Sequence, residues 1–143
     1  MRQSVLDTDI LSYITDERYP EVSQRAQQYY RVFRYFTVST ISIAEIVEGL
    51  ARNHDHAGID VFLRRAEGFE ILPVDLDEAV IAGKIFAALK EVGQKIGEQD
   101  PFIAAVAIAN NRPLVTNNTG HFQRIVDLGF PLEMENWREA KVD

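Results

Sequence analysis

The chain has 143 residues and no cysteine, so disulfides, thiolate chemistry and a cysteine-bound zinc cluster are excluded. A chain of this length can bury one sizeable core, and we expect a single domain over residues 1–143. Its 15 basic and 22 acidic side chains give a net charge of −7, which opposes nucleic-acid binding unless metal ions or a local basic patch reverse the field.

No segment has the pattern of a signal peptide. The longest nearly apolar run, residues 102–109, is far shorter than the roughly 20 residues that cross a bilayer. The absence of cysteine fits a reducing compartment. We therefore expect a soluble, cytoplasmic protein with no membrane partner.

Short β-prone runs alternate with amphipathic helical patterns along the chain. The predicted strands cover residues 4–6, 36–39, 69–72 and 114–116, with a short fifth strand at 131–134. The predicted helices cover residues 10–14, 21–36, 43–50, 59–66, 75–93 and 101–110. A polar turn over residues 117–120 follows the fourth strand.

This alternation predicts an α/β fold, with a mainly parallel sheet of four to five strands covered by helices on both faces. In such sheets, ligands bind beyond the carboxyl ends of the strands. Polar side chains occupy these positions, namely Asp7 after the first strand, Glu45 early in the helix after the second, Asp100 at the start of a later helix and Asn118 after the fourth strand.

We expect the three carboxylates of this set to converge and therefore to repel one another. A divalent cation relieves such repulsion, and oxygen ligands of this kind favour Mg²⁺ or Mn²⁺. An ion of this class can polarise a phosphate and lower the pKa of an attacking water. The sequence therefore predicts a metal site suited to phosphate chemistry.

The polar residues at the first two junctions also have ordinary structural interpretations. Asp7 or Asp9 could cap the helix that begins near Ile10, and we assign the cap to Asp9. Ser42 and Glu45 have the spacing of a capping box, which satisfies backbone amides without any metal. Taken singly, these structural interpretations are preferred over a functional one.

The later residues can be interpreted in the same way. Asp100 before Pro101 fits an ordinary helix start, and Asn118 fits a turn that tolerates left-handed geometry. The histidines are not expected to form a metal site, because two lie in a polar stretch at 54 and 56 and the third, His121, is far along the chain. The interpretation as a metal site therefore depends on the polar residues of all the strand-to-helix junctions taken together.

Four motifs, in order, carry a family resemblance. They are LDT at residues 6–8, a Ser-x-x-Ser-x-x-Glu run at 39–45, QDPFIAAVAI at 99–108 and LVTNNTGHF at 114–122. Together they resemble the PIN domain family, and specifically its VapC toxins of type II toxin-antitoxin systems. The resemblance covers residues 5–137.

The resemblance implies an α/β/α sandwich in which Asp7, Glu45 and Asp100 bind Mg²⁺ or Mn²⁺ and activate water for RNA cleavage, with Asn118 at a fourth position. It also implies supporting residues near these acids. The hydroxyl groups of Ser42 and Thr116 would orient carboxylates, and Asp9 would bond to a water on the metal. The clearest departure from the family pattern is Gly120, where related toxins frequently have arginine.

The resemblance further implies two protein partners, a second copy in a homodimer and a small antitoxin whose tail covers the acidic groove. The aromatic helical face over residues 21–36 is the first place where we look for a groove or interface. Arg124 is a candidate to replace the cation missing at Gly120.

Two other classes of protein remain as alternatives. Asp7 and Asp9 have the spacing of the nucleophile and acid of a haloacid-dehalogenase phosphatase, although the later lysine and acidic pair have no counterpart, and a receiver domain fails similarly. A non-catalytic RNA-binding module with the same fold is favoured by the net charge and Gly120. Asp7→Asn and Asp100→Asn variants separate these alternatives from a metal-dependent nuclease.

Overall fold

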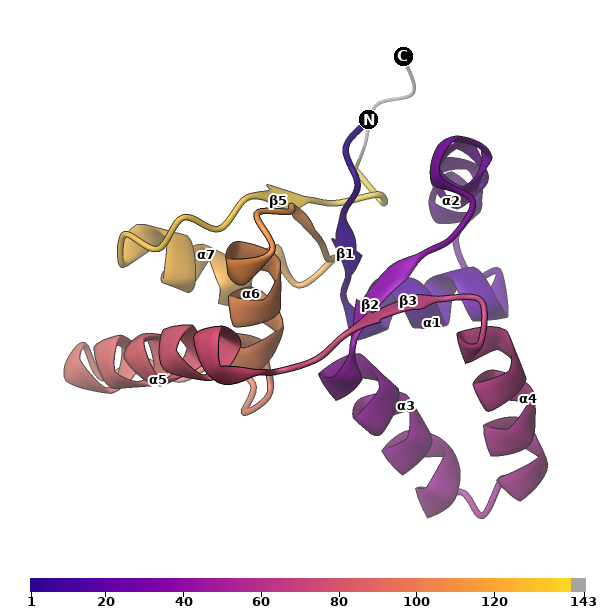
Figure 1. The fold of residues 1–143 in the computed structure, drawn as a ribbon, viewed down its shortest axis with the longest axis horizontal. Helices are drawn as coiled ribbons and strands as arrows, with labels where there is room; N and C mark the ends of the chain where they lie inside the picture. The colour runs from indigo at the N-terminus through magenta and orange to yellow at the C-terminus, as the bar shows by residue number, and fades with distance from the viewer. Residues whose placement is uncertain (140–143) are drawn as a thin grey trace.

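A five-stranded, all-parallel sheet forms the centre of the computed structural model, which describes residues 1–139. The strand order is β3-β2-β1-β4-β5, so β1 lies in the middle (Figure 1). The strands are β1 (Val5–Leu6), β2 (Thr37–Ser39), β3 (Glu70–Leu72), β4 (Leu114–Val115) and β5 (Met134–Glu135). The predicted parallel sheet of four to five strands is confirmed, with five.

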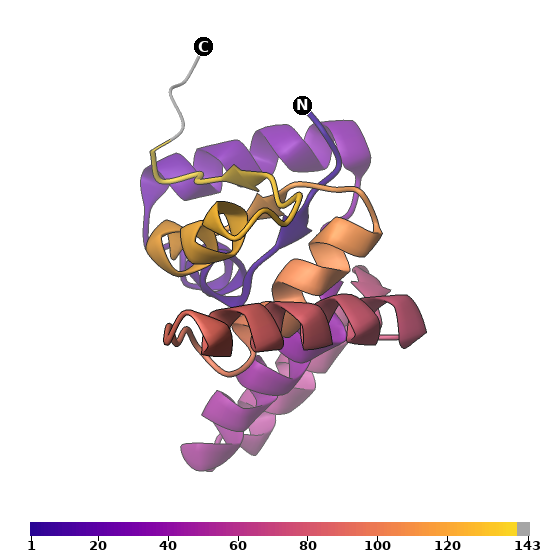
Figure 2. The same ribbon diagram turned by 90° about the vertical axis from the view of Figure 1, so that its left-hand side faces the viewer.

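Seven helices in the described part of the chain cover the two faces of this sheet (Figures 1 and 2). They are α1 (Thr8–Asp16), α2 (Pro20–Phe33), α3 (Thr40–Arg52), α4 (His56–Ala66), α5 (Leu76–Glu91), α6 (Asp100–Ala109) and α7 (Thr119–Asp127). Over residues 1–139, none of these helices combines the length and apolar character that a membrane span requires.

The strands separate two hydrophobic cores because successive side chains of a strand point to opposite faces. Val5 and Leu114 pack with α5, α6 and α7 in one core. Leu6 and Val115 pack with α1, α2 and α4 in the other. This is the expected α/β/α sandwich.

The direction of the chain across the sheet reverses beside β1. The chain proceeds outward from β1 to β2 and β3, and then crosses to the other side of β1 for β4 and β5. Such a reversal opens a crevice at the carboxyl ends of the two central strands. Because α6 ends just before β4 begins, its N-terminus also lies toward this end of the sheet.

Three helix starts differ from the prediction. Helix α1 begins at Thr8, and its N-cap is Asp7 instead of Asp9, because the carboxylate of Asp7 accepts a hydrogen bond from the Thr8 amide directly after the strand. Helix α3 is capped by Ser39, so the predicted capping box of Ser42 and Glu45 is wrong. Helix α5 begins at Leu76, with Asp75 at the N-cap position, and the Asp75 side chain makes no capping hydrogen bond.

The last two helices also begin differently. Asp100 is the first residue of α6, and its carboxylate faces away from the helix amides, with Gln99 at the N-cap. Helix α7 begins at Thr119 and so replaces the second half of the predicted turn over residues 117–120, with Asn118 as its N-cap and a negative φ. The helix is stabilised by burial of Phe122 and Ile125, whose short apolar pattern follows a turn-like sequence. The prediction of one domain extends to residues 140–143, which lie outside the described residues.

Candidate metal and nuclease site

Asp7 lies at the end of the central strand, where its side chain is 6% exposed. One carboxylate oxygen, Oδ1, accepts a hydrogen bond from the Thr8 amide at 2.8 Å, and Oδ2 accepts one from the Thr116 hydroxyl at 2.7 Å. Burial, followed by the charge of Asp9, raises the pKa of Asp7 to about 8. A buried carboxylate with this pKa is a group that a cation would stabilise.

Asp9 lies one residue into α1 and is fixed by backbone amides. Its Oδ2 accepts a hydrogen bond from the Asn117 amide at 3.0 Å, and its Oδ1 accepts one from Ile10 at 2.7 Å. Burial raises the pKa of Asp9, and the charge of Asp100 adds to the effect. Asp9 therefore joins α1 to the loop after β4 instead of capping the helix.

Glu45 is held by a relay of hydroxyl groups from α1 and α3. The Thr8 hydroxyl lies 2.7 Å from Glu45 Oε1 and 2.9 Å from Ser42 Oγ. A threonine hydroxyl has one hydrogen to donate, and the carboxylate can only accept, so Thr8 donates to Glu45 and accepts from Ser42. Ser42 therefore reaches the carboxylate through Thr8, which the sequence interpretation had not included.

Asp100 approaches the other acids from α6, and its side chain is 13% exposed. Burial raises the pKa of its carboxyl group. Its charge in turn raises the pKa values of Asp7, Asp9 and Glu45. Asp100 therefore acts electrostatically on all three of the other acids.

Asn118 and Thr116 complete the set at the end of β4. The Thr116 hydroxyl donates to Asp7 and accepts a hydrogen bond from the Asn118 amide at 2.9 Å. The side-chain amide of Asn118 lies 2.9 Å from Nδ1 of His121, and the same nitrogen lies 3.3 Å from Oδ2 of Asp100. His121 therefore contacts both Asp100 and Asn118, a contact that the sequence analysis did not predict.

The donor set at this end of the sheet fits a hard divalent cation. It consists of carboxylate oxygens whose pKa values are raised by burial and by mutual repulsion. Over residues 1–139, no three Asp, Glu or His side chains already have the close spacing of a metal-binding group. Carboxylate oxygens are nevertheless the ligand type that Mg²⁺ takes in proteins.

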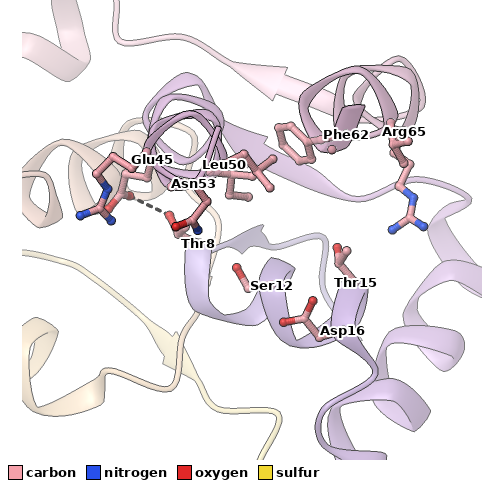
Figure 3. Close-up of a pocket in the computed structure, with 14 residues that line it drawn as sticks. Thr8, Ser12, Thr15, Asp16, Glu45, Leu50, Asn53, Phe62 and Arg65 are labelled. Atoms are coloured by element: carbon pink, nitrogen blue, oxygen red, sulfur yellow. Dashed lines mark hydrogen bonds between the residues drawn. The ribbon is translucent and has the colours of Figure 1, made fainter. Parts of the chain in front are cut away.

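A groove of about 540 Å³ begins at the Thr8 and Glu45 side of the site and runs between α1, α3 and α4 (Figure 3). Leu50 and Phe62 form part of an apolar wall, whereas Arg65 lies on α4 at the far side of the groove (Figure 3). Arg52 also lines it. The groove therefore joins an acidic end to apolar and basic walls.

Gly120 lies in the first turn of α7. A side chain at Gly120 would have open space, since no atom lies within 4 Å of its Cβ position. Arg124, the candidate replacement, donates a hydrogen bond to the backbone carbonyl of Lys95 instead. The structure therefore engages Arg124 elsewhere.

The aromatic face of α2 contributes mainly to the core. Tyr29 is 1% exposed and packs against Phe33, Phe36 and Trp137. Tyr30 remains partly exposed and, with Phe36, lines two smaller hollows. The groove next to the acids is lined by other helices than α2.

Sequence reasoning missed three residues that touch the predicted site, namely Thr8, Gly97 and His121. Two of them were inside the recognised motifs, Thr8 in LDT and His121 in LVTNNTGHF. Gly97 stands three residues before Asp100, a spacing at which a carboxylate can reach back to a backbone amide.

The fold and the acidic end of the sheet define a class of protein. The sequence model of the PIN domain family matches residues 4–128, which is most of the chain. The chain therefore belongs to the PIN domain family, in its VapC branch. The resemblance noted from the four motifs is confirmed.

Relatives in this branch cover nearly the whole chain. Ribonuclease VapC2 of Haemophilus influenzae is 33% identical, over 96% of this chain and 99% of its own length. Ribonuclease VapC1 of Methanocaldococcus jannaschii is 29% identical, over 90% of this chain and 85% of its own. The solved structure of VapBC2 from Rickettsia felis, bound to a promoter DNA fragment, contains a chain with 27% identity and a TM-score of 0.74, covering 94% of this chain and 98% of that one.

Proposed function

We propose that the protein is a Mg²⁺- or Mn²⁺-dependent endoribonuclease and the toxin of a toxin-antitoxin pair. The observation that supports the proposal is a network of hydrogen bonds through Thr116, Asn118 and His121 that links the carboxylates of Asp7 and Asp100. Thr8, directly after Asp7, holds the carboxylate of Glu45. The names of its relatives, which are ribonucleases, support the same reaction class.

In this proposal, Asp7, Glu45 and Asp100 hold the cation. When bound, such an ion supplies charge stabilisation to a phosphodiester and acidifies a nearby water. Thr116 and Thr8 keep the carboxylates of Asp7 and Glu45 oriented through their hydroxyl groups. Asp9 fixes the loop that carries Asn118, so the side chains from β1 and β4 stay in register.

The phosphatase alternative requires Asp7 to be an ionised nucleophile with an accessible oxygen. Asp7 is buried, and both of its oxygens already accept hydrogen bonds from Thr8 and Thr116. Burial raises its pKa to about 8, so in either role the group needs a nearby cation to ionise at neutral pH, and the hydrogen bonds decide between the roles. These contacts suit a fixed metal ligand better than a nucleophile.

The test is cleavage of a defined RNA panel, including tRNAs, by the purified protein in Mg²⁺, Mn²⁺ or EDTA. We expect cleavage that depends on the metal and is lost in Asp7→Asn and Asp100→Asn, while Asp60→Asn on the exposed face of α4 cleaves like the wild type. Metal-independent cleavage, or full activity in both site variants, would contradict the proposal. A phosphorylated Asp7 would establish the phosphatase alternative.

The antitoxin is proposed to cover the groove beside Glu45. Solved structures that resemble the chain include VapBC2 of Rickettsia felis and VapBC-1 of Haemophilus influenzae. The apolar wall suits an amphipathic segment, and the acidic end suits a basic side chain on it. Reversing a wall charge, Arg65→Glu, is expected to weaken capture of the antitoxin encoded beside the gene, whereas Arg64→Glu outside the groove is not.

The expected homodimer is tested separately by sedimentation of the purified protein. A mass of twice the 16.3 kDa chain at micromolar concentration would agree with it. A purely monomeric protein would remove the dimer from the proposal and leave the metal site unaffected.

A further inference from the structure

We propose that Gly97 and His121 are positioning residues for Asp100, which hold one of its carboxylate oxygens and leave the other free for a cation. The inference rests on the proposed function, because it assigns a role to residues beside a proposed metal ligand. It depends on contacts and space in the loop before α6 and at the start of α7.

The first contact is a closed turn before α6. The amide of Gly97 donates to Oδ2 of Asp100 at 3.2 Å, and the amide of Asp100 donates back to the carbonyl of Gly97 at 3.1 Å. These two bonds tie the carboxylate to its own loop. A carboxylate placed in this way does not cap the helix, so it is available to the site.

The second contact comes from α7, across the site. Nδ1 of His121 lies 3.3 Å from the same oxygen, Oδ2 of Asp100, and 2.9 Å from the side-chain amide of Asn118. A proton on Nδ1 serves the Asp100 contact, and the Asn118 amide can turn its oxygen toward the same proton. His121 thereby links two of the residues proposed to act at the metal.

The other oxygen, Oδ1 of Asp100, accepts no hydrogen bond from residues 1–139. Because Oδ2 is held by two donors and Oδ1 by none, the rotation of the Asp100 carboxylate is fixed. Oδ1 is then free to bind a cation, with no donor from the described part of the protein competing for it. Outer partners of this kind commonly change metal affinity about 10- to 100-fold when removed.

The absence of a side chain at residue 97 is itself part of the arrangement. A Cβ built on Gly97 would lie 2.8 Å from Oδ2 and 3.2 Å from Cγ of Asp100, closer than atoms pack. Its three nearest neighbours all belong to the Asp100 carboxylate. The clash that an alanine would cause here is therefore relieved by rotation of that carboxylate, with little strain on the fold.

The experiment measures Mn²⁺ affinity by calorimetry and by the paramagnetic resonance of free Mn²⁺, on the full chain without RNA. We expect Gly97→Ala to weaken Mn²⁺ binding roughly 10-fold while the metal-free melting temperature stays within about 2 °C of the wild type. The matched control is Gly83→Ala, which adds the same methyl group in open space on α5 and should bind Mn²⁺ normally.

His121 is tested by rescue. His121→Ala should weaken Mn²⁺ binding by a similar factor, and His121→Asn, whose amide can occupy the place of Nδ1, should recover most of the loss. In an Asp100→Asn background, adding Gly97→Ala should cause no further loss, because the group it displaces is already changed.

The outcomes separate this inference from the proposed function. Wild-type affinity in Gly97→Ala and His121→Ala overturns the positioning roles, even if RNA cleavage depends on metal. An equal further loss in the Asp100→Asn background also overturns them, because it indicates general damage. Failure of the wild type to bind Mn²⁺ overturns the proposed function and the inference with it.

Discussion

Asp7 caps a helix and is also a buried acid, and in the absence of a metal these two roles have opposite effects on stability. Its carboxylate caps α1 through the Thr8 amide, which favours the fold. It is also buried beside Asp9, and this raises its pKa to about 8, so folding at neutral pH must either protonate the group or bury its charge. A buried acid of this kind lowers stability until a cation compensates for it.

The first prediction concerns this conflict. Asp7→Asn keeps an acceptor for the Thr8 amide but removes the charge, so the metal-free protein should gain about 1–3 kcal/mol in the free energy of unfolding at pH 7. The variant should lose the rise in melting temperature that Mn²⁺ gives the wild type. Urea unfolding with EDTA, and thermal unfolding with and without Mn²⁺, measure both effects.

The control is Asp60→Asn, which changes an exposed acid on α4 and should alter neither quantity. A metal-free Asp7→Asn protein that is less stable than the wild type would contradict the argument from burial.

The second prediction concerns the hydroxyl of Thr8. Thr8→Val has nearly the same shape but cannot donate to Glu45, so kcat for RNA cleavage should fall roughly 10-fold with little change in KM. Thr8→Ser retains the donor and should remain close to wild type. Equal kcat values for the valine and serine variants would show that the hydroxyl has no role.

At the scale of elements, β3 and the loop before β4 are joined at the amino-terminal end of the sheet. The carboxylate of Glu70 accepts hydrogen bonds from Arg112 and from the hydroxyl of Thr37, the latter at 2.8 Å. These partners, Arg112 first, lower the pKa of Glu70 below its ordinary value of 4.5. The edge strand β3 is thereby tied to the segment that leads into a central strand.

The third prediction follows from the sign of that shift. Because the folded-state pKa is lowered, the unfolded chain binds more protons near pH 4, and the stabilisation is present above about pH 4.5 and lost as the pH falls through the folded-state pKa. Glu70→Gln should lower the free energy of unfolding at pH 7 by about 0.5–1 kcal/mol. The difference from wild type should shrink toward pH 3.

Urea unfolding at several pH values measures this difference. Glu91→Gln, which changes an exposed acid at the end of α5, is the control and should follow the wild type. A Glu70→Gln deficit that grows on acidification would contradict the assigned sign.

Most elements could be predicted because their apolar periods are long, as in α2 and α5. The placement of the acids at one edge of the sheet could also be predicted, since parallel strands have their carboxyl ends at the same edge. Helix α7 could not be predicted, because Asn117 to Gly120 has turn-forming chemistry and only Phe122 and Ile125 supply a buried face. The contacts of Gly97 and His121 depend on loop conformations that no periodicity encodes.

At the scale of the whole molecule, the last described segment completes the second core. Trp137 is 1% exposed, and its ring centroid lies 5.5 Å from that of Tyr29 on α2. It lies beyond residue 128, where the match to the PIN family model ends. The segment after α7 is thus required for packing, although it contributes no acid to the site.

The fourth prediction tests this role. Trp137→Ala should destabilise the protein by about 3–5 kcal/mol, because it removes the side chain and leaves a cavity against Tyr29. Trp137→Phe fills part of the space and should lose less. Circular dichroism during urea unfolding is the measurement, since Trp137 is the only tryptophan of the chain. If Trp137→Ala lowered the free energy of unfolding by less than about 0.5 kcal/mol, as substitutions at exposed positions do, its place in the core would be contradicted.

The position of β1 at the centre of the sheet has a consequence for synthesis of the protein. Asp7 meets its hydroxyl partner Thr116 only after 109 further residues have been added. At about 5–20 residues per second, translation separates the two by roughly 5 to 20 seconds. The hydrogen bond that orients the Asp7 carboxylate therefore forms only when nearly the whole chain has been made, so the acidic end of the sheet is completed among the last events of folding.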